Sequence, residues 1–225
     1  DIEDVYSAIA RQGYTHVIVL MIAECLSSAN NLMRLAAEEH PELTVKVFDS
    51  KSASIGLGAL AVQVARYAVR GVAFDPLCEL TKRLIDDTVV YFSLDTLEYL
   101  QRGGRIGRAT ALAGGLLQIK PILTVDRKDG MISTAAKVRG RRGVQQRLIE
   151  LATELAAKHR GEEYNLVVCD GNVPEEGAAL EAALTRELPN AHRVLHGKID
   201  ATLAVHLGPN LLGVGVQFLN SKLPA

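Results

Sequence analysis

Two apolar runs of strand length near the start of the chain constrain its fold most. Thr15–Ala23 (THVIVLMIA) is almost unbroken, and Leu43–Ser50 (LTVKVFDS) follows it after a helical stretch. Strands covered by helices on both faces have this pattern, whereas half-exposed strands alternate polar and apolar residues. The alternation of strand and helix continues to Val89–Leu94, which we interpret as a third strand. The first part of the chain therefore predicts an α/β lobe with a doubly wound parallel sheet.

The pattern changes after about residue 107. Ile122–Val138 contains two strands around Lys128-Asp129-Gly130, a turn signal typical of an antiparallel hairpin. Two helical stretches and further short strands follow, and we expect the last two strands at Thr202–Leu207 and Gly213–Phe218. We predict an α/β domain over residues 1–107 and an α+β domain with a mainly antiparallel sheet over residues 108–225. The absence of a linker predicts a cleft where the two meet.

A helical corner connects the two predicted domains. Asp95 and Glu98 have the spacing of an N-terminal capping box, and Gly103-Gly104 is a typical helix end. Arg105 then lies in a short turn before a second predicted helix. Its guanidinium suits a carboxylate or phosphate, which it can bind with paired N–H donors. From spacing alone, a purely structural role as a cap of helix carbonyls is equally compatible.

A serine pair marks a second candidate binding position. Ser27 and Ser28 stand at a predicted helix start, just past the end of the first strand. Ligands of open α/β sheets bind at this end of the strands, and a helix N-terminus offers free N–H groups to an anion. On spacing alone, simple N-capping is the favoured explanation of the pair, because it needs one hydroxyl and no ligand.

The composition excludes several functional classes. The 225 residues carry a formal net charge of −1, and the aromatic fraction is 4% with no Trp, which argues against nucleic-acid binding. No apolar run is long enough for a membrane span. Phosphate-loop, HExxH, CxxC and GxSxG motifs are missing from the sequence, so we expect no metal and no cofactor. Three scattered cysteines fit a reducing cytoplasm.

Several motifs together resemble one known family. LDTLEYLQRGGRIGRA is followed by IKPILTV, a DG hairpin and KVRG; VFDSKSASIGLG precedes them and AVHLGPNLLGVG comes after. In this order they resemble the DegV family of bacterial fatty-acid-binding proteins. The resemblance implies a monomeric carrier that holds one long-chain fatty acid between two domains. It also implies an ATP-dependent kinase partner that phosphorylates the presented carboxylate for phospholipid synthesis, so that the chain itself is a substrate-presenting subunit without enzymatic activity of its own.

The resemblance also implies which residues hold the carboxylate. Ser27-Ser28-Ala29 aligns with a Ser-Gly-Thr element, Arg139 with the arginine of KVRG, and His206 with a histidine near the head group. With Arg105, the expected head-group site is Ser27, Ser28, Arg105, Arg139 and His206. Family members also begin with a strand and a Thr/Ser-rich loop that would precede Asp1, so we expect this sequence to be a fragment.

Two alternatives to a lipid carrier stay open. The first is an enzyme or binding protein for a small phosphorylated metabolite, with Arg105 and Arg139 as a phosphate clamp. The second is an α/β scaffold that has lost its ligand. A sugar-phosphate site needs several Asn, Asp or Lys side chains for its hydroxyls, and few stand near these motifs. The balance of residues therefore favours the lipid carrier.

Overall fold

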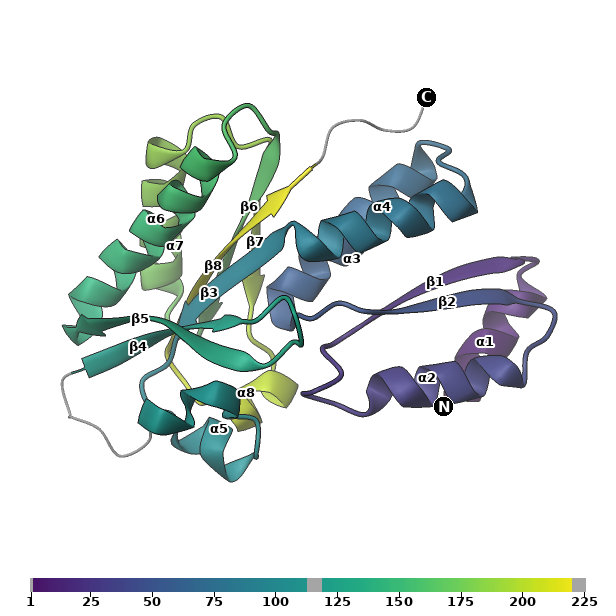
Figure 1. The fold of residues 1–225 in the computed structure, drawn as a ribbon, viewed down its shortest axis with the longest axis horizontal. Coiled ribbons are helices and arrows are strands. Elements are labelled where there is room, and N and C mark those ends of the chain that lie inside the picture. The colour runs from purple at the N-terminus through teal and green to yellow at the C-terminus, as the bar shows by residue number, and fades with distance from the viewer. Residues whose placement is uncertain (1, 113–118, 220–225) are drawn as a thin grey trace.

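The fold combines two β-sheets with helices packed around them (Figure 1). The computed structural model describes residues 2–112 and 119–219. The helices are α1 (Ile2–Arg11), α2 (Ala29–Glu38), α3 (Ser54–Val69), α4 (Phe74–Asp86), α5 (Glu98–Arg102), the 3-10 helix η1 (Gly107–Leu112), α6 (Gly140–Lys158), α7 (Pro174–Glu187) and α8 (Ala201–Leu207). The strands are β1 (His16–Met21), β2 (Thr44–Asp49), β3 (Thr88–Ser93), β4 (Ile119–Val125), β5 (Ile132–Arg139), β6 (Tyr164–Gly171), β7 (Arg193–Lys198) and β8 (Leu211–Phe218).

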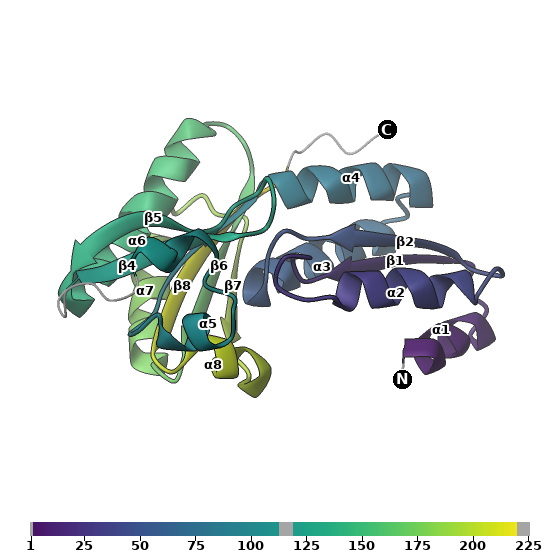
Figure 2. The same cartoon turned by 60° about the horizontal axis from the view of Figure 1, so that its bottom comes forward.

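The smaller sheet pairs β1 with β2 in parallel, from His16 opposite Thr44 to Met21 opposite Asp49. Helices cover both of its faces (Figure 2). Alternate residues explain this layering, because Val17 and Val19 pack with α1 and α2, while Ile18 and Leu20 pack against the core of α3 and α4. The prediction of parallel apolar strands between helices is confirmed for these two strands.

The larger sheet has six strands in the order β5-β4-β3-β8-β6-β7. Within it, β6 and β7 are parallel, and the other neighbouring pairs are antiparallel. The hairpin prediction is confirmed, since β4 and β5 pair antiparallel and the turn between them contains Gly130 at φ +73°. The predicted fold class, an α/β part followed by an α+β part with a mainly antiparallel sheet, is therefore confirmed.

One strand was assigned to the wrong sheet. The run Val89–Leu94 largely corresponds to β3, which does not extend the parallel sheet but pairs antiparallel with both β8 and β4. The error has a physical cause, because α3 and α6 pack on β3 and a central strand covered by helices is apolar in either orientation. The division of the chain at residue 107 stays a prediction.

Two local predictions around the helical corner are also wrong. Thr202–Leu207 is not a strand but belongs to α8, which Asp200 starts by accepting a hydrogen bond from Leu203 N–H at 3.0 Å. Asp95 does not cap α5, which begins two residues later than a capping box requires. Its carboxylate instead accepts a hydrogen bond from Asn210 Nδ2 at 2.7 Å.

The turn after Arg105 continues as the 3-10 helix η1, and the rest of the expected second helix falls partly outside the described residues.

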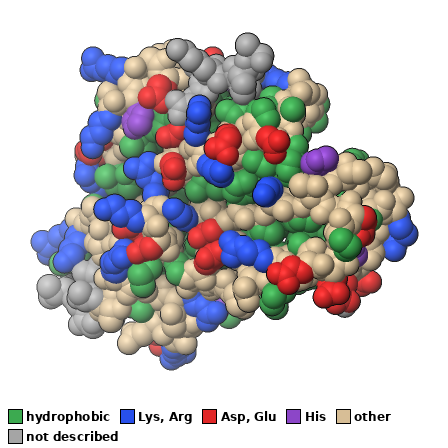
Figure 3. Space-filling view, turned by 45° about the vertical axis from the view of Figure 1, so that its right-hand side comes forward, with side chains coloured by type: hydrophobic (Ala, Val, Ile, Leu, Met, Phe, Trp, Pro, Cys, Tyr) green, Lys and Arg blue, Asp and Glu red, His purple; other side chains and the backbone are tan. Residues whose placement is uncertain are grey.

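The surface carries charges of both signs. On the face shown in Figure 3, basic and acidic side chains are interspersed with apolar ones rather than segregated by sign. This distribution accords with the formal net charge of −1. Among the residues that the structure describes, none of the helices has the length and apolar character needed to cross a membrane.

Candidate functional site

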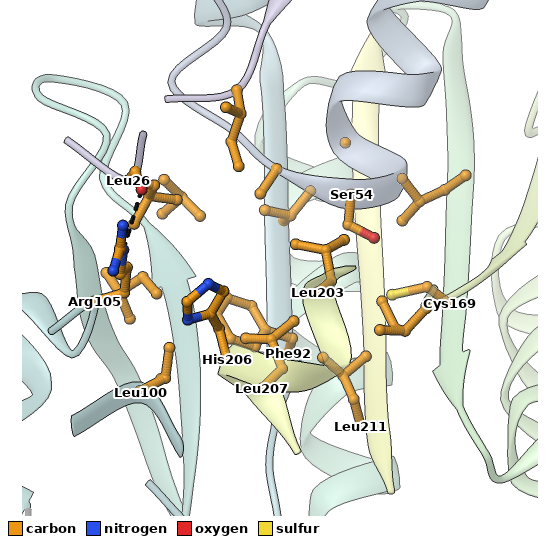
Figure 4. Close-up of a pocket in the computed structure, with 18 of the residues that line it drawn as sticks. Leu26, Ser54, Phe92, Leu100, Arg105, Cys169, Leu203, His206, Leu207 and Leu211 are labelled. Carbon is orange, nitrogen blue, oxygen red and sulfur yellow. Dashed lines mark hydrogen bonds between the residues drawn. The ribbon is translucent and has the colours of Figure 1, made fainter. Parts of the chain in front are cut away.

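An apolar cavity of about 100 Å³ lies between the six-stranded sheet and the loops that follow β1 and β2. Strands β3 and β8 supply its floor, and helices α5 and α8 border it on another side (Figure 4). The lining residues are Ile22, Leu26, Ala53, Ser54, Ile55, Gly56, Val90, Tyr91, Phe92, Leu100, Arg105, Val125, Ile132, Cys169, Ile199, Leu203, His206, Leu207, Leu211 and Val214.

The polar atoms of the lining side chains are few. Arg105 and His206 lie near each other on one side of the cavity, whereas Ser54 and Cys169 lie on the other (Figure 4). Cys169 is buried, and burial, followed by the nearby charge of Asp170, raises the pKa of its thiol to about 12. Cys169 is therefore protonated at neutral pH and behaves as a small apolar group.

Arg105 connects the helical corner to the loop after β1. Its Nε donates to the carbonyl of Leu26 at 3.2 Å, and its Nη1 donates to the carbonyl of Gly103. The backbone N–H of Arg105 also closes the end of α5 on the carbonyl of Leu100 at 2.9 Å. Arg105 therefore has the capping role considered from the sequence, and it also lines the cavity; its role in binding a carboxylate stays a prediction.

His206 projects from α8 toward the cavity, between Arg105 and Leu203 in Figure 4. Its Nδ1 is buried and has no hydrogen-bond partner within the described part of the chain. Gly103 makes room for the ring, because a Cβ at that position would lie 2.5 Å from His206 Nδ1. The double glycine therefore does more than end α5, since its first member allows this imidazole to approach.

The other three predicted head-group residues do not line this cavity. Ser27 is half-buried beside the lining residue Leu26, and its hydroxyl accepts a hydrogen bond from Ala29 N–H at 3.3 Å. Ser28 is exposed at the start of α2. Arg139 is exposed at the end of β5, opposite Ile119. Of the five residues, the structure brings Arg105 and His206 together at the cavity and places the other three outside its lining.

The loop between β2 and α3 was missed as a candidate. Lys51 and Ser54 have positive φ angles of 46° and 53°, which are unfavourable for residues other than glycine. The hydroxyl of Ser52 is buried and has no hydrogen-bond partner among the residues that the structure describes, and Ser54 lines the cavity. The repeated serines of DSKSAS were the available signal, but serine clusters are also common in ordinary turns.

Comparisons with known proteins agree with this architecture. The model of a family described as an uncharacterised protein family, DegV, matches residues 1–219. A DegV domain-containing protein of Clostridium acetobutylicum is 34% identical over 219 residues, which cover 95% of this chain and 75% of that protein.

Solved structures of fatty-acid-binding proteins are also similar to this chain. A fatty-acid-binding DegV family protein from Thermus thermophilus has a TM-score of 0.89 and 29% identity, with 97% of this chain and 76% of that chain covered. A fatty-acid (stearic acid)-binding protein from Eubacterium ventriosum has a TM-score of 0.88 and 25% identity, with coverage of 99% and 76%. The family match and the shared fold lead to one conclusion: this chain belongs to the DegV family.

Proposed function

We propose that the chain binds a long-chain fatty acid, with the hydrocarbon in the apolar cavity and the carboxylate beside Arg105 and His206. The observation that carries this proposal is the pairing of an almost wholly apolar lining with one guanidinium and one unpartnered imidazole nitrogen. The similar structures from Thermus thermophilus and Eubacterium ventriosum, which bind fatty acids, support it.

The energetics favour a ligand with a long hydrocarbon part. Each buried methylene contributes about 0.8 kcal/mol, so an acyl chain reaches useful affinity through burial alone. The side chains that would contact it come from β3, β8 and α8, including Val90, Leu203 and Val214. These three apolar side chains offer no hydrogen-bonding groups to sugar hydroxyls or a nucleobase, and few of the other lining residues are polar, which makes a polar metabolite a poor fit for this space.

The carboxylate needs charged or polar partners, because burying an unpaired charge is costly. A guanidinium has five N–H donors, and the carbonyls of Leu26 and Gly103 occupy two of those of Arg105. The remaining donors and His206 Nδ1 offer charge-assisted hydrogen bonds to a carboxylate at the edge of the cavity. Ser27 directly follows the lining residue Leu26 in the loop after β1, so we keep it in the proposed head-group site.

We further propose that the chain is a cytoplasmic, monomeric carrier without catalytic activity, and that it presents the carboxylate to an ATP-dependent kinase subunit. The position of Arg105 supports presentation of the carboxylate to a partner, because this residue is exposed at the surface and also reaches the cavity. The alternative of a phosphate clamp formed by Arg105 and Arg139 is not favoured, because Arg139 is not among the lining residues.

Native mass spectrometry after incubation with stearic acid tests the binding proposal. We expect one fatty acid per chain, and two variants of α8 provide a matched pair. Leu203→Arg places a charge in the cavity lining and should abolish the bound mass, whereas Val205→Arg changes a side chain that is 70% exposed and should retain it. A wild-type chain that carries no fatty acid, or equal retention by both variants, would overturn the proposal.

A further inference from the structure

Three arginines gather at the end of the six-stranded sheet that lies away from the cavity. Arg66 lies in the last turn of α3, and Arg70, four residues later, is the C-cap residue of the same helix, so the two share one side of its end. Arg193 is the first residue of β7. Helix α3 packs on β6 and β7, which brings the two helix residues and the strand residue into one neighbourhood.

A buried side-chain contact sets the position of α3 over these strands. Asn165 on β6 donates to Gln63 on α3 at 3.4 Å, and Asn165 is the partner of Arg193 in the ladder between β6 and β7. Arg66 follows Gln63 by three residues, on the same side of the helix. Arg66 therefore lies on the side of α3 that faces β6, whose residue Asn165 pairs with Arg193.

Within the described part of the chain, no acidic side chain forms an ion pair with these three arginines. The Nη1 of Arg66 is buried and has no hydrogen-bond partner, and no ion pair is formed by Arg66, Arg70 or Arg193 within residues 2–112 and 119–219. Burial lowers the pKa of Arg66, and the positive charges of Arg193 and then Arg70 lower it further. Buried donors without partners and like charges side by side both cost stability, and an anion would offset both costs.

We propose that Arg66, Arg70 and Arg193 form a binding site for a phosphate group. Guanidinium groups bind phosphate oxygens with paired N–H donors, and a doubly charged phosphate can compensate several of them together. The site is separate from the lipid cavity. Cys169, which lines the cavity, stands four residues beyond Asn165 on β6, a separation of about 13 Å along an extended strand.

Thermal unfolding in inorganic phosphate, compared with sodium chloride at the same ionic strength, tests the site. We expect phosphate to raise the unfolding temperature of the wild-type chain beyond the effect of chloride, and isothermal titration to detect binding of one phosphate. Arg66→Gln and Arg193→Gln should each weaken phosphate binding by about tenfold or more. Arg186→Gln is the matched control, because this arginine is 74% exposed on α7, and its variant should bind phosphate as the wild type does.

Vesicles distinguish a free phosphate from a lipid head group. The wild type and both variants are sedimented with phosphatidylcholine vesicles, with and without phosphatidylglycerol. Capture by the phosphatidylglycerol vesicles that depends on Arg193 would assign a lipid phosphate, whereas binding of inorganic phosphate without capture would assign a soluble ligand. Stabilisation by phosphate no greater than by chloride, or equal stabilisation of both variants, would overturn the proposal whether or not the cavity binds a fatty acid.

Discussion

The two sheets differ in how deeply their strands are buried. Every residue of β6 and β8 is buried, whereas Val19 is the sole buried residue among the strands β1 and β2. Both regions nevertheless contribute to the cavity, the larger sheet through its floor and the smaller sheet through the loops at its strand ends. We call the loops that follow β1 and β2 the wall of the cavity. Because local stability follows the density of buried contacts, the comparison indicates that the floor is rigid and that the wall is more easily displaced.

Matched leucine substitutions test this contrast most strongly. Leu166→Ala in β6 removes a fully buried side chain and should lower the free energy of unfolding by about 2–5 kcal/mol. Leu20→Ala in β1 removes a half-buried side chain and should cost about 1 kcal/mol. Urea unfolding followed by circular dichroism measures both values. Equal losses would show that the two sheets are equally well packed and would remove the basis of the comparison.

Arg105 joins the two regions, because it stands on the corner beside the larger sheet and binds the carbonyl of Leu26 in the wall. Arg105→Ala should weaken fatty-acid binding by roughly ten- to a hundredfold, the equivalent of about 1.5–3 kcal/mol for a hydrogen bond to a charged group. Arg105→Lys should recover part of the loss, because one ammonium cannot reproduce the paired donors. Titration of a fluorescent fatty acid against the folded protein measures the affinity.

A nearby arginine provides the control for this measurement. Arg102 is on the same corner, its side chain is 76% exposed, and it pairs with Glu98 on the surface of α5. Arg102→Ala should leave the affinity unchanged. If Arg105→Ala reduces stability but leaves the affinity per folded molecule unchanged, Arg105 is only a cap, and the head group must be bound elsewhere.

The hairpin between β4 and β5 makes a second contact with the wall. Gly130 packs so closely that an added Cβ would lie 2.8 Å from Ala23 Cβ, and its carbonyl accepts a hydrogen bond from the Cys25 thiol at 2.8 Å. Gly130→Ala should therefore combine backbone strain with a clash against the wall, and lower the free energy of unfolding by about 1–3 kcal/mol. The displaced wall should also weaken fatty-acid binding.

Gly161→Ala measures the cost of backbone strain without a clash. Gly161 also has a positive φ of 90°, but an added Cβ there would have no atom of the described residues within 4 Å. This variant should be less destabilised than Gly130→Ala and should bind fatty acid normally. Equal losses in both variants would mean that contact between the hairpin and the wall does not matter for the cavity.

Much of this organisation could be predicted from the sequence, and the errors have identifiable causes. The turn at Gly130 and the apolar runs of β1 and β2 were informative because local chemistry determines them. The sheet to which β3 belongs could not be predicted, because a strand buried on both faces is apolar whichever direction it runs. Asp95 was misassigned because its spacing suits a capping box, while its partner Asn210 is 115 residues away.

The candidate site was predictable only in part for the same reason. The turn that holds Arg105 is local, so its glycines marked it, and family resemblance added His206. The role of Gly103 in admitting the His206 ring depends on a contact between α5 and α8, which no local pattern reveals. Ser54 was missed because its positive φ is a property of the folded loop rather than of the residue type.

His196 gives the smallest expected effect and concerns the larger sheet alone. Its ring lies between Glu181 Oε2 at 2.5 Å and Asp170 Oδ2 at 3.2 Å. Burial alone would lower the pKa of His196, but the two carboxylates outweigh it, and the pKa is raised. Because the folded state then holds the proton more tightly, this contribution is fully present below the unfolded pKa of about 6.5 and is lost as the pH rises through the folded value.

Urea unfolding between pH 6 and pH 8.5 should therefore show a decline in stability attributable to His196. The decline should be below about 1 kcal/mol, because the side chains of His196 and Glu181 are 29% and 36% exposed and water screens the pair. His196→Gln should flatten this part of the profile, and Glu181→Gln should reduce it while leaving the imidazole in place. A wild-type profile in the His196→Gln variant would show that another group controls the pH dependence. The decline should be seen in the unfolding of the larger sheet. If it is seen only in the unfolding of the region around β1 and β2, the stabilities of the two sheets are coupled more tightly than the burial of their strands indicates.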